Sequence, residues 1–357
     1  MDKSSRQVNE KEKSYNYSIA FMKAFFSFLV VCCHYWTPKD PTFYPTAALL
    51  RLIGVAVPVF VITSFFLTAK IYQEQDFPKL KKRLWRLAFP YVIWGVLYFA
   101  GYSLIDLLIK QVSWKDGLRL DLTVTDLLWQ LGLGSSEKLS PQLWYSFVLI
   151  VMTVVIWLLF KLGQKYTPLL LAVLSAGMFV LQYTGLNFKV FGAMRYEMRY
   201  PLGRLCEMLP FVCLGILLAM GILQKLSQRR VLVAIGAGAT LLLIGICGWF
   251  ITMPESFTYG GIFTLLYGGL AFLFFYMLPM EKLPECIRKI LKFLARYSFG
   301  VFCIHFGVGY LWNAVLCRRF GWQTNTMLQC LVIYVISLLV SFLVSRIPGK
   351  LSKQLVE

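Results

Sequence analysis

The chain has 357 residues with a mean hydropathy of +0.66, and 58% of its residues are hydrophobic while only 15% are charged. This composition excludes a soluble globular protein and is typical of a polytopic membrane protein. The net charge of +19 would suit a nucleic-acid partner, but Lys and Arg are dispersed between apolar runs and form no basic stripe, so nucleic acid is excluded.

Windows of about 20 apolar residues predict about ten transmembrane helices, so the expected fold class is all-α. The predicted helices cover residues 18–36, 50–70, 84–106, 142–161, 168–184, 204–223, 231–251, 258–279, 296–317 and 327–346. They form one transmembrane domain, residues 18–346, between an N-terminal tail (1–17) and a C-terminal tail (347–357). The first apolar run ends in CCHYW without a small-residue cleavage pattern, so we interpret it as an anchoring helix and not as a signal peptide.

The distribution of Lys and Arg predicts that both termini are cytoplasmic. With that orientation the cytoplasmic segments hold about twice as many basic residues as the outer ones, which is the usual positive-inside asymmetry. Loops 70–83 and 280–296 then lie inside, and loop 107–141 lies outside. Membrane lipids are the partners that this predicts, and a bacterial plasma membrane is the expected location. The sequence leaves the oligomeric state open, including a dimer.

The first predicted helix carries two ionisable side chains, Lys23 and His34, which are eleven residues apart. At about 1.5 Å per residue they lie about 16 Å apart along the helix, and eleven steps of about 100° return to the same face. Ionisable groups in hydrocarbon are costly, so the pair predicts a site that faces the protein interior. The alternative, a snorkelling lysine and an interfacial histidine, explains each residue singly but not their shared face.

The nine cysteines fall mostly within predicted helices and show no metal-ligand spacing. They predict neither a metal site nor a disulfide framework. We therefore expect them to behave as small hydrophobic residues.

Several segments resemble motifs of the acyltransferase-3 family of integral membrane acyltransferases. Lys23 and His34, with ten residues between them, match the basic-x10-histidine signature that opens this family. The segment KKRLWRLAFPYVIW, which contains Arg83 and Arg86, resembles the basic start of the family's third helix. LWYSFVLI and YSFGVFCIHF resemble its L-W-[FY] and S-[FY]-G-[IV]-[FY]-x-[IV]-H motifs. The resemblance covers nearly the whole chain.

Two positions depart from the family pattern. Lys23 stands where many members have arginine, which keeps the positive charge but loses the bidentate fork. In VPVFVITSFFL, Phe65 occupies the position of the usual glycine, so the close backbone approach that glycine allows is not expected there.

The resemblance implies transfer of an acyl group, most simply acetyl, from cytoplasmic acyl-CoA to a hydroxyl of a cell-surface or exported glycan. Lys81, Lys82, Arg83 and Arg86 would place four positive charges at the inner mouth, of which Arg83, Arg86 and Lys82 are the candidates to hold the CoA phosphates, because arginine forks suit phosphate. Lys23, one to two turns deeper, would contact the thioester arm or a pyrophosphate oxygen and is also a catalytic candidate. The alternative for this cluster is a plain topology signal, since any cytoplasmic loop is basic. Acyl-CoA is the implied donor, and no metal is implied.

His34 would act as the general base on the acceptor hydroxyl, because an imidazole is largely neutral at neutral pH and can accept a proton. A covalent acyl-histidine intermediate is a variant that the sequence does not separate from this role. Glu207 is the acidic candidate to orient His34, with a salt bridge to Arg204 or to an arginine of an outer loop as an equally supported alternative. His305 is a further catalytic candidate through its motif, and a structural histidine hydrogen-bonded across helices is its alternative.

The predicted outer segment at the start of the sixth helix is rich in basic residues, although the positive-inside rule predicts few basic residues on the outer side. Arg195, Arg199 and Arg204, together with nearby aromatic side chains, predict binding of an acidic or phosphate-linked glycan, with lipid head groups as an equally supported alternative. Trp144 and Tyr145 are candidates to line the acceptor site, although such residues are enriched at membrane interfaces in any case.

Two other classes of function stay open. The first is a transporter or flippase of a surface-polymer intermediate, in which Lys23 and His34 form the pathway. Paired Gly- or Pro-broken helices in corresponding halves would favour it, and we do not find them in the sequence. The second is a non-catalytic sensor or partner protein, for which loss of the motif histidine would be the mark, and that histidine is present.

Overall fold

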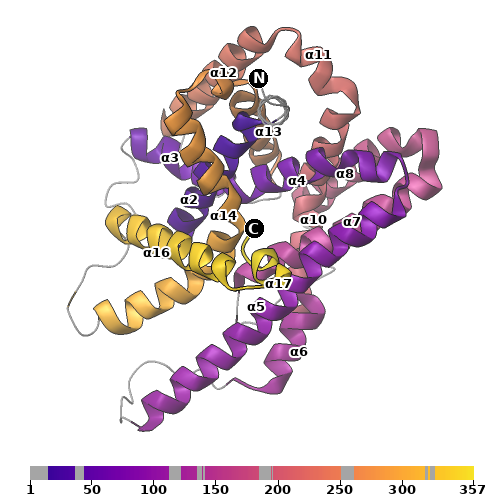
Figure 1. Cartoon of the computed structure of the whole chain (residues 1–357). Coiled ribbons are helices and arrows are strands. Elements are labelled where there is room, and N and C mark those ends of the chain that lie inside the picture. The colour runs from indigo at the N-terminus through magenta and orange to yellow at the C-terminus, as the bar shows by residue number, and fades with distance from the viewer. Residues whose placement is uncertain are drawn as a thin grey trace, which may run out of the picture.

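The structure is a computed structural model, and it describes residues 15–36, 44–111, 122–134, 139, 141–184, 194, 196–250, 261–317, 321 and 326–357. These residues are almost entirely helical and include no strand, which confirms the all-α prediction. Helices satisfy their backbone hydrogen bonds internally, as a chain in a bilayer requires. Figure 1 shows them as one bundle, from which α5 and α6 extend side by side at one end.

The helices, with their bounds, are α2 (Tyr17–Tyr35), α3 (Tyr44–Gly54), α4 (Ala56–Gln73), α5 (Phe77–Gln111), α6 (Val124–Leu133), α7 (Trp144–Gly163), α8 (Thr167–Tyr183), α10 (Tyr196–Leu217), α11 (Leu223–Ser227), α12 (Arg230–Phe250), α13 (Ile262–Met277), α14 (Glu285–Leu311), α16 (Met327–Arg346) and α17 (Lys350–Gln354). Short 3-10 turns cover Pro141–Leu143, Gln164–Tyr166 and Met280–Lys282, and π turns follow α10 and α14.

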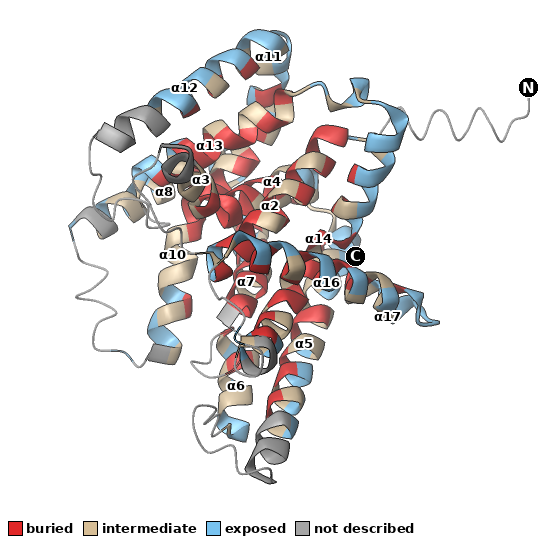
Figure 2. Cartoon of the chain, turned by 90° about the vertical axis from the view of Figure 1, so that its left-hand side faces the viewer, coloured by how far each residue is buried: buried red, intermediate tan, exposed pale blue. Residues whose placement is uncertain are grey.

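Helix α2 lies at the centre of the bundle. It packs against α14, α16, α4 and α13, and 67% of its apolar window is buried, the largest share among the candidate spans in the described residues. Figure 2 shows the same contrast: red dominates α2 and α4, whereas the peripheral α12 is largely pale blue. The Asn16 side chain caps α2 by accepting a hydrogen bond from the Ile19 N–H at 2.9 Å. A polar side chain on α2 is therefore held inside the protein unless it lies at a helix end.

Eight helical segments of the described residues are long and apolar enough to cross a membrane, so the chain is a multi-pass membrane protein. One of them, Trp144–Leu181, contains α7 and most of α8, which the sequence predicts as separate helices. The turn Gln164–Tyr166 separates the two, and φ of Gln164 is 43°. Arg230–Ile244 is a shorter apolar helix. The count of about ten spans and the cytoplasmic termini stay predictions.

Some predicted helices differ from the observed ones in extent. The helix predicted over 50–70 is interrupted at Val55, whose φ and ψ of −102° and 6° separate α3 from α4. The sixth and ninth predicted helices begin earlier, at Tyr196 and Glu285, because charged residues lower the hydropathy of their first turns without ending the helix. The predicted loop 107–141 contains α6, which a capping box begins.

The last residues of the chain fold back onto the bundle. The indole N–H of Trp94 on α5 donates to the Leu355 carbonyl at 3.0 Å, and the Gly300 N–H on α14 donates to the Val356 carbonyl at 3.1 Å. The Val356 side chain is fully buried. This segment therefore joins α5 to α14 within the described structure.

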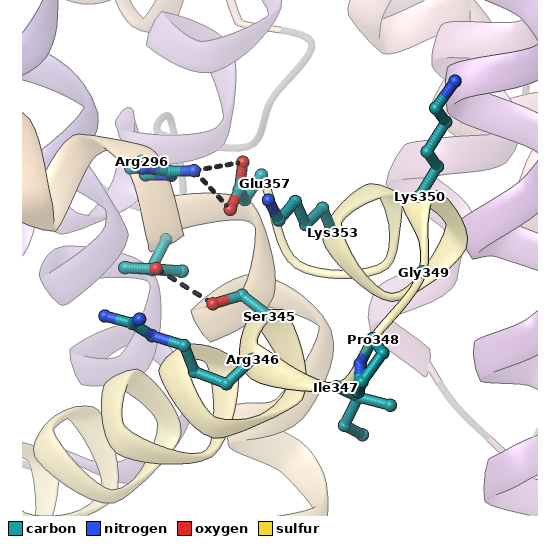
Figure 3. Close-up of a pocket in the computed structure, with 10 residues that line it drawn as sticks. Arg296, Ser345, Arg346, Ile347, Pro348, Gly349, Lys350, Lys353 and Glu357 are labelled. Carbon is teal, nitrogen blue, oxygen red and sulfur yellow. Dashed lines mark hydrogen bonds and ion pairs between the residues drawn. The ribbon is translucent and has the colours of Figure 1, made fainter.

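A pocket of about 680 Å³ lies beside this docked segment, between α14 and the end of α16. Its walls include Arg296, Arg346 and Lys353, and Arg296 forms an ion pair with Glu357 at 2.8 Å. Figure 3 shows that pair and shows Lys350 pointing away from it. None of the site residues predicted from the sequence lines this pocket.

Gly215 allows α10 to approach α4 closely. A Cβ atom at this position would lie 2.5 Å from the Ile62 carbonyl oxygen, a backbone atom that only a movement of α4 could displace. Gly215→Ala should therefore lower the melting temperature of the detergent-solubilised protein, because overpacking costs about 1–3 kcal/mol. Gly101→Ala, which adds its methyl group in open space on α5, is the matched control and should not lower it. Equal melting temperatures for the two variants would contradict the close contact.

Candidate active site

Cationic side chains gather at the Lys23 end of α2. Lys23 is half-buried, and the charge of Arg86 on α5 is close enough to repel its ammonium group. Arg83, one turn before Arg86, also lies within electrostatic range of Arg86. Helix α5 thus brings Arg86 within electrostatic range of Lys23 on α2, and the side chains of Arg86 and Lys82 are both exposed.

Neutral groups hold the Arg83 guanidinium. Its Nε donates to Thr153 Oγ1 on α7 at 3.0 Å, and its Nη2 donates to Ser64 Oγ on α4 at 3.0 Å. The guanidinium also lies over the Phe65 ring, 5.2 Å from the centroid. Phe65 is fully buried, so at the position of the usual glycine this chain places an aromatic ring that supports Arg83 by a cation–π contact.

No carboxylate among the described residues forms an ion pair with these three cations, Lys23, Arg83 and Arg86. The ion pairs of the described structure join other residues, such as Arg230 and Glu281 at 2.6 Å. Positive charges without an acidic partner are costly in apolar surroundings, and an anionic ligand compensates that cost. The cluster is therefore chemically suited to phosphate groups.

The two histidines of the chain meet at the other end of α2. The His34 ring lies 5.4 Å from the His305 ring of α14 between centroids, and both rings contact Phe306, at 4.6 Å and 4.8 Å. The His34 side chain is exposed, whereas His305 is fully buried. Within the described residues neither ring nitrogen of His34 has a hydrogen-bond partner, so one of them is free to accept a proton.

The hydrogen bonds of His305 define its tautomer. Its Nδ1 lies 3.0 Å from the Val301 carbonyl oxygen and 2.7 Å from that of Phe302, and because both oxygens are acceptors, Nδ1 must carry the hydrogen. The Nε2 atom is then an acceptor, and it is buried without a partner in the described structure. A buried acceptor next to a second imidazole is suited to receive that ring's N–H.

Glu207 does not stand free for His34. Its carboxylate accepts a hydrogen bond from Arg204 at 2.7 Å, which is the salt bridge that the sequence left as an alternative. The Arg204 guanidinium also lies over two rings, 5.2 Å from the Trp144 centroid and 4.9 Å from the Tyr200 centroid. This arrangement fixes Arg204, Glu207 and Trp144 to one another.

The remaining predicted acceptor residues are dispersed. Arg199 is exposed on the first turn of α10, and Arg195 lies outside the described residues. Tyr145 is buried, lies 5.0 Å from the Phe302 ring and is within electrostatic range of Arg83. Tyr145 therefore lies between the Arg83 region and the helix that carries His305. Among the described residues no cluster of His, Cys, Asp or Glu could hold a metal ion.

The sequence analysis did not single out Tyr35 or Phe306, which both contact the histidine pair. The Tyr35 hydroxyl donates to the His305 carbonyl at 3.5 Å, and its ring packs against Gly309, where any side chain would clash. Each of the two aromatic residues follows a histidine directly in the chain. That adjacency is a weak signal, since consecutive helical residues usually point in different directions.

A family model for the acyltransferase domain matches residues 16–346, which is nearly the whole chain. Comparisons with curated proteins and with solved structures gave no match. The matched region begins just before α2 and ends with α16, so it includes the cationic cluster, the histidine pair and the helices that carry them. The chain therefore belongs to the acyltransferase-3 family and is a membrane acyltransferase.

Proposed function

We propose that this chain transfers an acyl group, most simply acetyl, from cytoplasmic acyl-CoA to a hydroxyl of a cell-surface or exported glycan, with His34 as the general base. The observation that carries the proposal is the arrangement along α2. One helix joins the uncompensated cations near Lys23 to the histidine pair, about 16 Å away. An extended donor with phosphates at one end and a thioester at the other suits two sites that are separated in this way.

The cationic cluster supports acyl-CoA as the donor. Arg83 and Arg86 would make charge-assisted hydrogen bonds to the CoA phosphates. Lys82 would add positive charge before the two arginines, and Lys23 would add it beyond them along the path of the donor. The hydroxyls of Ser64 and Thr153 support this assignment because they orient the Arg83 guanidinium without neutralising it.

The histidine pair supports proton transfer at the other end. In the proposed step, a His34 nitrogen takes the proton of the acceptor hydroxyl while the hydroxyl oxygen attacks the thioester carbonyl. The carbon–sulfur bond breaks, and the CoA thiolate leaves with the proton that His34 received. His305, through its Nε2, would accept the other N–H of His34 and stabilise the imidazolium. His305 thereby replaces Glu207 as the proposed orienting partner.

The acceptor would approach His34 from the outer side of the membrane. The proposed glycan contacts are Arg195, Arg199, Trp144 and Tyr145. Arg204 would support glycan binding by holding the aromatic rings beside it in place. The bacterial plasma membrane and its lipids are the proposed setting.

The proposal is tested with membranes from cells that express the chain. They are incubated with acetyl-CoA labelled in the acetyl group, and label is measured in the glycan, lipid and protein fractions against membranes without the chain. We expect label in the glycan fraction, released by mild base as acetate because it is an ester. Movement of an unlabelled polymer intermediate across the membrane, with no acetyl transfer to any acceptor offered, would instead support the transporter.

A further inference from the structure

Tyr98, a buried residue of α5, reaches across to the turn of α14 that carries His305. Its hydroxyl donates to the Cys303 carbonyl at 2.6 Å and accepts from the Gly307 N–H at 3.1 Å. Cys303 and Gly307 are four residues apart, so they are the acceptor and donor of one helical hydrogen bond. The Tyr98 hydroxyl therefore bridges the backbone groups on either side of His305.

This bridge lies at a point where α14 is constrained from several directions. Gln142 also approaches the Cys303 carbonyl, at 3.4 Å, and Tyr35 on α2 contacts the backbone of His305 itself. A side chain that inserts into the backbone ladder of a helix changes the local direction of that helix. The position of the His305 ring relative to His34 thus depends on how α5 and α2 hold this turn.

We propose that Tyr98 is a positioning residue for the histidine pair: its hydroxyl fixes the Cys303–Gly307 turn so that His305 faces His34. This inference rests on the proposed function. Tyr98 touches neither His34 nor any group proposed to bind the donor, so its effect would pass through the backbone of α14. A misplacement of a catalytic partner by about 1 Å can cost up to about a hundredfold in rate, whereas donor binding at the far end of α2 would not change.

Tyr102 provides a matched control. It lies one turn further along α5, its ring is 5.5 Å from that of Tyr98, and it is similarly buried. Its hydroxyl forms no hydrogen bond within the described residues. Tyr98→Phe and Tyr102→Phe therefore remove the same atom from neighbouring rings, and only the first removes the bridge to α14.

The test measures kcat and the acyl-CoA KM of both variants in the membrane transfer assay, per amount of folded protein. Tyr98→Phe should lower kcat about tenfold or more while the acyl-CoA KM stays within about twofold, and Tyr102→Phe should change neither. An unchanged kcat in Tyr98→Phe would overturn the proposal, and so would an equal loss in both variants. His34→Ala is measured beside them: if it abolishes transfer while Tyr98→Phe does not, only the positioning role fails, whereas retained transfer in His34→Ala overturns the assignment of His34 as the base. Absence of transfer by the unaltered chain overturns the proposed function itself.

Discussion

Replacing His34 with alanine should lower acyl transfer by about a hundredfold or more, the scale of a positioned general base, and should leave acyl-CoA binding unchanged. The protein should still fold, because the His34 side chain is exposed at the end of α2 and makes no hydrogen bond within the described residues. The measurement is the initial rate of label transfer from acetyl-CoA, at matched protein level and with the melting temperature as a check on folding.

Cys33→Ala is the control for this variant, since Cys33 is the exposed neighbour of His34 on the same helix turn. It should retain near-normal transfer. His305→Ala should also reduce transfer, and it should lower the melting temperature as well, because His305 is fully buried and its removal leaves a cavity. Near-normal transfer by His34→Ala would remove His34 from the mechanism.

Replacing Arg83 with alanine should raise the acyl-CoA KM by about ten- to a hundredfold, because each charge-assisted hydrogen bond to a phosphate contributes about 1.5–3 kcal/mol. The dependence on acceptor concentration should change little. Arg83→Lys should recover part of the loss, since lysine keeps the charge but not the fork that Ser64 and Thr153 orient. The measurement is the acyl-CoA dependence of the transfer rate for each variant.

Arg86→Ala should show the same pattern as Arg83→Ala, whereas Lys81→Ala should have a smaller effect, because Arg86 interacts electrostatically with Lys23 and Lys81 lies more than a helix turn earlier on α5. Equal small effects for all three would mean that the basic residues of this segment serve only membrane topology.

The sequence predicts most of the membrane helices because their apolar runs are long enough to dominate a hydropathy window. It fails where a helix changes course without losing hydrophobicity. The break at Val55 lies inside an apolar run, between Gly54 and Pro58. Pro58 has no backbone N–H to donate to the Gly54 carbonyl four residues earlier, so the interruption between α3 and α4 has a local cause that hydropathy does not register. Hydropathy windows fail at the first turns of α14, from Glu285, for the opposite reason: charged residues lower the hydropathy there, yet the turns remain helical.

The candidate site divides in the same way. The sequence predicts that Lys23 and His34 share a face because both lie on one helix, whose period fixes the direction of each side chain. His34 lies beside His305, and Arg86 interacts with Lys23, only because particular helices pack together. The spacing of these residues along the chain does not predict which helices do so. The resemblance pointed to both histidines, but only the packing of α2 against α14 brings the two rings together.

The most direct test of the account uses sealed membrane vesicles of known orientation. Acyl-CoA does not cross a bilayer, so the side on which labelled acetyl-CoA supports transfer identifies the side that binds the donor. Inside-out vesicles, which expose the predicted cytoplasmic Lys and Arg cluster, should transfer label to glycan in the lumen, and right-side-out vesicles should not. His34→Ala should abolish the transfer in inside-out vesicles. Equal transfer from both orientations, or transfer that does not require His34, would contradict the account.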